Sequence, residues 1–171
     1  MSIKQKIFDY LRKKQPVREP RFPHMDQSLK VMLIYESDVL ERNDAIKKVR
    51  QELLRKQMDV TTWGYVEKKV ISTLILPQSR ILGTADYNWL GKPRDYVLND
   101  LQAEHYDLLI DLTIHPSLPL QYLAMYTNAD FKVGLKVSEG LHDMLIAADE
   151  IDESGLFEQI IRYLTSIRSM D

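Results

Sequence analysis

Residues 106–119, YDLLIDLTIHPSLP, predict a buried strand that ends in a turn before a helix. The run from Tyr106 to Leu112 is almost entirely apolar, which is typical of a strand covered on both faces in a parallel sheet. Ser117 can cap the following helix, which we expect to continue to Tyr126. A chain built around such a strand needs helices on both sides of its sheet.

Strand-length apolar runs alternate with helical patterns along the rest of the chain. We expect the other strands over residues 30–35, 59–66, 80–85, 131–136 and 144–147. We expect helices over about 38–57, 93–104 and 154–169, with Asp38 and Glu41 at capping-box spacing and Pro93 as the first helical residue. Residues 67–79 fit a helical stripe and an extended segment equally well.

This alternation predicts an α/β fold with three layers, in which helices cover a doubly wound, mostly parallel sheet of the Rossmann-like type. The strand order 3-2-1-4-5 is favoured, because the connection over residues 86–106 has the length of a crossover between parallel strands. The flavodoxin-like order 2-1-3-4-5 is the alternative.

The amino terminus has a different pattern from the rest of the chain. Residues 2–14 predict a short amphipathic helix, with apolar side chains at helical spacing among lysines and arginines: Ile3, Ile7, Tyr10 and Leu11. Three prolines make residues 15–28 an extended connector. We therefore expect two parts, residues 1–28 and a single α/β domain over 29–171. The helix could dock on this domain, on a partner chain or weakly on a membrane surface.

Composition excludes several classes of site. The chain of 171 residues has no cysteine, and its histidines lack metal-ligand spacing, so we expect no metal. A net charge of −2 gives no pull toward nucleic acid. No apolar run reaches the roughly 20 residues of a membrane-spanning helix, and the basic amino terminus lacks the apolar core of a signal peptide. We expect a cytoplasmic protein with no integral membrane segment.

Known nucleotide-binding and hydrolase motifs are missing from the sequence as well. The turn after the first strand is YESD, which is not the glycine-rich loop that holds a dinucleotide. The GxxxxGK[ST] phosphate loop and the GxSxG elbow of hydrolases are also absent from the sequence. We therefore predict no cofactor, and the sequence leaves open whether the chain is an enzyme.

A ligand crevice is expected where the strand order reverses, outside the carboxyl ends of the first and central strands. Three segments converge there in the favoured topology. They supply eight candidate ligand-binding residues: Ser37, Asp38, Asn88, Trp89, Lys92, Asp111, Thr113 and His115.

Each of these candidates has a functional and a structural interpretation. Asp111 can anchor a ligand or act as a general base, but it can equally satisfy the amides of the following turn. His115 can exchange protons near neutral pH, or it can be a solvated loop residue. The turn 86–93, DYNWLGKP, can hold an anion at a helix start through Lys92, or Trp89 can simply pack at the edge of the core.

Two stretches carry a resemblance to known proteins. Asn88-Trp89-Leu90-Gly91-Lys92-Pro93 and YDLLIDLTIHPSLPLQYLAMYTNADFKVGL, residues 106–135, resemble a family of small uncharacterised proteins from the Bacteroides group of bacteria. The second stretch is also similar to the acceptor-side domain of heptosyltransferase-type glycosyltransferases. Those enzymes have two Rossmann-like domains, and this chain has room for one, so a complete glycosyltransferase is not expected.

Two functions follow from these patterns. One is the binding of a small molecule or anion in the crevice, with or without a reaction. The alternative is a non-catalytic interaction module that docks through its amino-terminal helix, on a partner protein or as a homodimer. The sequence does not identify the ligand.

Overall fold

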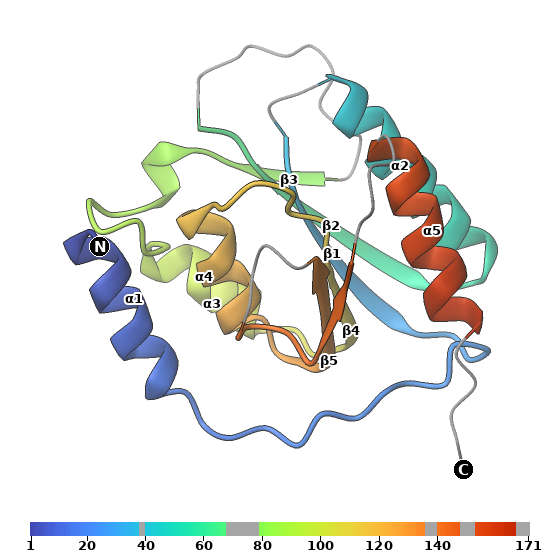
Figure 1. The fold of residues 1–171 in the computed structure, drawn as a ribbon, viewed down its shortest axis with the longest axis horizontal. Coiled ribbons are helices and arrows are strands. Elements are labelled where there is room, and N and C mark those ends of the chain that lie inside the picture. Colours follow the sequence, from blue (N-terminus) through green and yellow to red (C-terminus); the bar gives the residue numbers. More distant parts are fainter. Residues whose placement is uncertain (38–39, 68–78, 136–139, 148–152, 167–171) are drawn as a thin grey trace.

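Six parallel strands form the centre of the structure, a computed structural model that describes residues 1–37, 40–67, 79–135, 140–147 and 153–166. The strands are β1 (Lys30–Glu36), β2 (Asp59–Tyr65), β3 (Ser79–Leu82), β4 (Tyr106–Asp111), β5 (Ala129–Leu135) and β6 (Met144–Ile146). Their order in the sheet is β3-β2-β1-β4-β5-β6 (Figure 1). This confirms the favoured order 3-2-1-4-5 and adds a sixth strand at the edge; the flavodoxin-like alternative was wrong.

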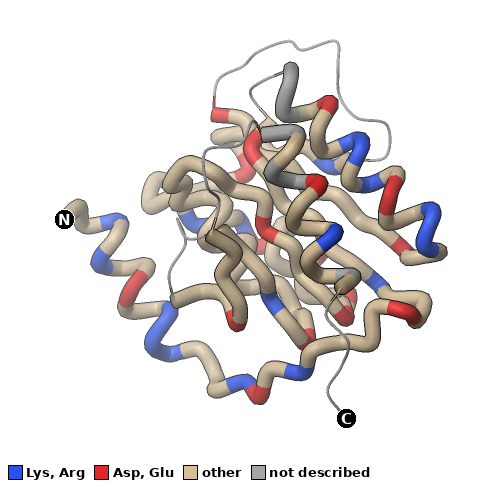
Figure 2. The backbone as a smooth tube through the Cα atoms, turned by 45° about the vertical axis from the view of Figure 1, so that its right-hand side comes forward, with Lys and Arg blue, Asp and Glu red and all other residues tan. Residues whose placement is uncertain are grey.

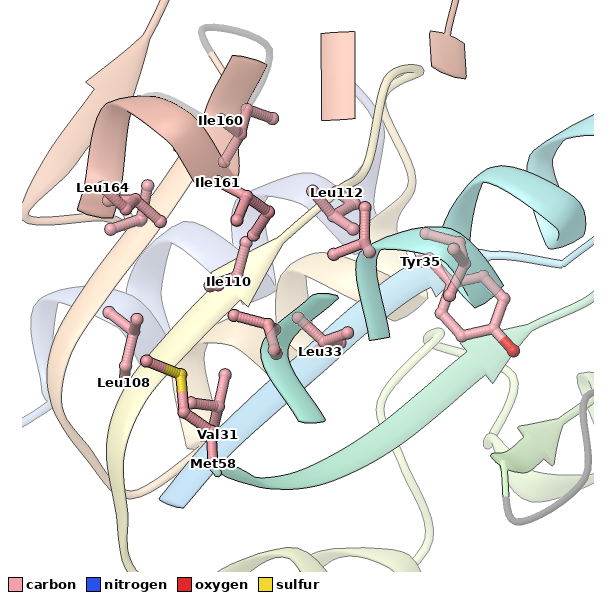
Figure 3. Close-up of a cluster of buried hydrophobic side chains, with 14 of the residues drawn as sticks. Val31, Leu33, Tyr35, Met58, Leu108, Ile110, Leu112, Ile160, Ile161 and Leu164 are labelled. Atoms are coloured by element: carbon pink, nitrogen blue, oxygen red, sulfur yellow. The ribbon is translucent and has the colours of Figure 1, made fainter. Parts of the chain in front are cut away.

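The helices divide between the two faces of this sheet. Those after the amino-terminal part are α2 (Leu40–Arg55), α3 (Asp95–Gln102), α4 (Leu118–Tyr126) and α5 (Glu153–Ser166), with a short 3-10 helix η1 (Thr84–Asp86). Side chains of β1 and β4 alternate between the faces, as the pleat requires. Val31, Leu33, Leu108 and Ile110 pack with the α2 and α5 side, where Ile160 and Leu164 lie (Figure 3). The other face packs with α3 and α4 and includes Met32, Ile34, Leu109, Val97, Leu101 and Leu120.

Several predicted boundaries shift because of contacts within the turns. The third strand ends at Leu82, three residues early, where the Asp86 carboxylate accepts a hydrogen bond from the Gly83 amide at 2.8 Å and closes η1. Pro93 is not helical, because it forms an isolated antiparallel bridge with Tyr87 and α3 begins at Asp95. Ser117 does occupy the position before α4, but its side chain makes no capping hydrogen bond.

Helix α1 (Ile3–Lys13) packs on α4 through a residue that the predicted stripe left out. Phe8 is buried, with 2% of its surface exposed, and its ring meets that of Tyr122 edge-on at a centroid distance of 4.9 Å. Ile3 and Tyr10 of the predicted stripe are exposed instead. The expectation that the helix docks on the domain is met at its Phe8 face, while the choice of inward residues was partly wrong.

The connector holds the amino-terminal part along the start of β5. Arg18 Nη1 donates to the Ala129 carbonyl at 2.9 Å, and the Arg21 amide donates to the Asp130 carbonyl at 3.1 Å. Arg18 also forms a two-pronged ion pair with Asp143 at 2.7 and 2.8 Å. Because β6 pairs with β5 only from Val133 onward, these contacts cover the edge that β6 leaves open.

Candidate functional site

A cleft of about 400 Å³ lies at the carboxyl ends of β1 and β2, against the turn that leads into α4. It is next to the point where the strand order reverses, between β1 and β4, which is where open α/β sheets bind their ligands. Its walls come from three segments that are far apart in the sequence. The lining residues are Glu36, Tyr65, Glu67, His115, Pro116, Ser117, Leu118 and Pro119.

Glu36 is the buried carboxylate of this cleft. As the last residue of β1, it accepts hydrogen bonds at Oε2 from the amides of Ile114 and His115, at 3.0 and 3.3 Å. Its Oε1 lies 3.3 Å from His115 Nδ1. These contacts compensate the cost of burying a charge and fix the turn after β4. They also orient the imidazole of His115, whose side chain is 67% exposed.

The lining of the cleft is acidic and aromatic. Glu36 and Glu67 both contribute to it, and the part of its lining that the structure describes includes no lysine or arginine. Burial, and next the negative charge of Glu67, raise the pKa of the Tyr65 hydroxyl, so Tyr65 stays a neutral hydrogen-bond donor. The Tyr65 ring meets that of Tyr87 edge-on at 5.3 Å, which holds this wall in place. Such a surface accepts hydrogen bonds and attracts positive charge.

Asp111 lies in the protein interior and does not line the cleft. Only 2% of the residue is exposed, and its Oδ1 accepts hydrogen bonds from the Thr113 amide, at 3.0 Å, and the Thr113 hydroxyl. Its Oδ2 lies 2.9 Å from Nε2 of His142, a side chain that is completely buried. Both oxygens therefore have partners within the chain, as the structural interpretation of Asp111 requires.

The sequence patterns did not indicate a role for His142. It lies directly before β6, and its ring packs on Gly134 of β5. A glycine in the interior of a strand signals the close approach of another group. Gly134 was thus the one local signal for this contact, although it does not identify the group that approaches.

Of the remaining candidates, Thr113 and Ser37 are described by the structure and do not line the cleft. Thr113 is buried against Asp111. The Ser37 hydroxyl donates to Asn43 Oδ1 at 3.2 Å, and the Ser37 amide donates to the Tyr65 carbonyl at 2.8 Å. Asp38 lies outside the described residues, as do residues 68–78, for which the sequence favoured neither helix nor strand.

The turn 88–92 is closed by its own hydrogen bonds. Asn88 Oδ1 accepts from the amides of Leu90 and Lys92, at 2.9 and 3.1 Å. Gly91 has a φ of +81°, a conformation that favours glycine. Lys92 Nζ lies 5.9 Å from the centre of the Tyr126 ring, and Trp89 is 72% exposed. Asn88, Trp89 and Lys92 are thus not brought into the cleft.

The described residues offer neither a metal cluster nor a membrane-spanning helix. Within the described residues, no group of three or more His, Asp or Glu side chains is arranged to hold a metal ion. Among the helices described, none has the length and apolar character needed to cross a membrane.

The fold is that of a Rossmann-like α/β protein with a cleft at its strand ends. Residues 1–167 match the model of a family of unknown function, DUF6913, and the chain belongs to that family. The comparison with curated proteins gave no match.

Two solved structures share the fold. They are the Escherichia coli heptosyltransferase WaaC with ADP, at a TM-score of 0.53 and 13% identity, and the glycosyl transferase family 9 protein from Veillonella parvula DSM 2008, at 0.54 and 14%. The matches cover 82% and 86% of this chain but only 49% and 44% of those chains. The chain therefore spans about half of their length or less, and the likeness is one of fold.

Proposed function

We propose that the chain binds a small molecule that carries hydroxyl or amino groups in the cleft between Glu36, Glu67 and His115. The observation that carries this proposal is the placement of Glu36. A carboxylate with two amide partners and one imidazole partner stands at a strand end, in a cleft, beside the reversal of strand order. Pockets of about 300–1,000 Å³ are usual for small ligands, and this cleft falls within that range.

The ligand class follows from the lining. Two carboxylates accept hydrogen bonds from hydroxyl or ammonium groups, and they repel phosphate and carboxylate groups. The expectation of an anion rested on Lys92, and that residue belongs to a closed turn with its ammonium over Tyr126. A neutral polyol or an amine therefore fits the cleft better than an anion.

Calorimetric titration with a panel of ligands tests this proposal. The panel contains polyols, amino sugars and polyamines, with sugar phosphates and nucleotides as the anionic comparison. We expect binding in the first group, and we expect Glu67→Gln to weaken it by about 10- to 100-fold, because a hydrogen bond to a charged group contributes about 1.5–3 kcal/mol. Glu36→Gln keeps an acceptor for the turn amides and should weaken binding similarly.

Lys92→Ala is the matched control, because it removes a charge outside the cleft. The Lys92→Ala variant should bind the same ligands with the affinity of the unmodified chain. Binding confined to anionic ligands, or binding that depends on Lys92 and is indifferent to Glu67, would contradict the proposal.

The proposal also includes a cytoplasmic location in a bacterium of the Bacteroides group, as the sequence patterns suggest, and cell fractionation tests the location.

The alternative of an interaction module depends on α1. Its Phe8 face already packs against α4 of the same chain, so only its outward face is open to a partner. This observation favours the cleft as the primary site.

A further inference from the structure

Helix α1 has two apolar faces, and only one of them is used by the fold. Phe8 is buried against Tyr122. Ile3 and Tyr10, at 61% and 57% exposure, are seven residues apart and so lie on one face of the helix. At about 100° per residue, that face is turned by roughly 140–160° from Phe8. The second apolar stripe therefore faces away from α4.

Lysines flank this outward stripe. Lys6, Lys13 and Lys14 are exposed and lie within about 80° of it around the helix. Lys14 Nζ is 4.4 Å from the centre of the Tyr10 ring. Residues 1–14 hold five lysines or arginines and one aspartate, whereas the whole chain has a net charge of −2. Figure 2 shows the basic residues spaced along α1.

A second exposed aromatic side chain belongs to a turn that packs on α4, as α1 does. The turn 88–92 rests on α4, because Gly91 packs against Leu118 and Lys92 lies over Tyr126. Leu118 and Tyr126 also pack in the cluster that holds Phe8. Trp89, at the tip of this turn, is 72% exposed.

We propose that this surface, formed by Ile3, Tyr10, Trp89 and the flanking lysines, binds the face of an anionic lipid bilayer. A helix that lies in the membrane interface has apolar residues on one side and lysines around them, as α1 does. Tryptophan and tyrosine side chains concentrate at that interface because their rings are apolar and their edges polar. Nucleic acid would engage the lysines but would leave Ile3 without an apolar partner, so the bilayer fits the surface better.

Vesicle binding by the full chain provides the test. The probe is a vesicle of equal parts phosphatidylglycerol and phosphatidylcholine, with pure phosphatidylcholine as the neutral comparison. Sedimentation should show binding to the anionic vesicles alone, lost at high salt. The emission of Trp89 should shift to the blue, while Trp63, which is buried, contributes little change. Trp89→Phe should remove that shift.

Lysine substitutions test whether binding depends on this surface or on positive charge anywhere on the protein. Replacing Lys6, Lys13 and Lys14 by Gln should weaken partitioning into the anionic vesicles about fivefold for each lysine. Each basic residue near an anionic surface contributes a similar amount to the binding free energy. The matched control replaces Lys47 and Lys48 of α2 and Lys56, the residue after it, which are also exposed, on the opposite face of the sheet. That control should bind as the unmodified chain does.

Ile3→Ser tests the apolar stripe and should weaken binding without lowering the melting temperature, because Ile3 is exposed. Equal loss in the two triple variants, equal binding to neutral vesicles or no binding at all would overturn the proposal. So would retention on DNA at salt concentrations that abolish vesicle binding, because nucleic acid would then be the better occupant.

Discussion

The ring of His142 lies so close to Gly134 that a methyl group on that glycine would stand 2.6–2.7 Å from three of its atoms. The same ring reaches Asp111 with its Nε2, at 2.9 Å. The segment before β6 is thus tied to the centre of the sheet through one buried side chain. Gly134 provides the space that this contact needs.

Gly134→Ala should therefore destabilise the protein by about 1–3 kcal/mol, because the added methyl group overpacks the site and displaces the imidazole from Asp111. Urea unfolding measures the change. Gly83→Ala is the control, since the nearest atom to its added methyl group is 4.0 Å away. Similar losses in both variants would mean that the contact with His142 is not the cause.

Asp111→Ala tests whether this carboxylate is structural. The change leaves the Thr113 hydroxyl and amide, and the His142 ring, without their buried acceptor, so we expect a loss of about 3–5 kcal/mol. Chemical denaturation measures it, with Asp100→Ala on exposed α3 surface as a control. A variant of normal stability that has lost ligand binding would instead assign Asp111 to the site.

The order of the sheet could be predicted because it depends on features that are local in the sequence. Apolar runs of strand length mark the buried strands, and the long connection before β4 requires a crossover. The residues at which strands and helices end in a turn depend on contacts that cannot be read from the sequence. Pro93 looks like a helix start until its bridge to Tyr87 is known, and Asp86 ends the third strand by accepting a bond from Gly83.

The sequence predicted the position of the cleft but, apart from His115, not the residues that line it. Topology alone located the crevice beside β1 and β4, since parallel strands bring their carboxyl ends to one edge. Which side chains turn toward that crevice depends on contacts across the chain. The Asp111 carboxylate is hydrogen-bonded to His142, 31 residues away, and the Asn88 side chain accepts hydrogen bonds from the amides of its own turn. Nothing in the sequence indicated that Glu67 and Tyr65 would line the cleft.

Phe8→Ala should loosen α1 from the domain. Truncation of a buried phenylalanine costs about 3–5 kcal/mol, and here the loss falls on the packing of α1 against α4. Trypsin cleavage at Arg18 and Arg21 in the connector should become faster, because the connector detaches from β5 more often.

Ile3→Ala is the control for this experiment, because Ile3 is on the same helix and is exposed. Its cleavage rate should be unchanged. The experiment also tests the proposed division at residue 28: if residues 29–171 form a domain of their own, the cleaved product should keep a cooperative melting transition. Equal cleavage of both variants would show that Phe8 does not hold the helix.

Lys132 should make stability depend on pH above neutrality. Its side chain is buried in β5 and donates to the Ala124 and Met125 carbonyls at the end of α4, at 2.8 and 3.2 Å. Burial, and next the positive charge of Arg18, lower the pKa of this lysine to about 7, while Asp143 opposes the shift. The unfolded chain keeps the ordinary value of 10.5.

Between these two values the unfolded state binds a proton that the folded state has lost, so the contribution of Lys132 to stability rises with pH, by at most about 1.4 kcal/mol per pH unit. Below about pH 7 both states carry the charge, and the contribution is constant at its lowest value. Urea unfolding of the unmodified chain and of Lys132→Met, from about pH 6 to about pH 10, gives the difference between them. That difference should shift in favour of the unmodified chain as pH rises through this window, and a difference independent of pH would show that the folded chain keeps Lys132 charged throughout.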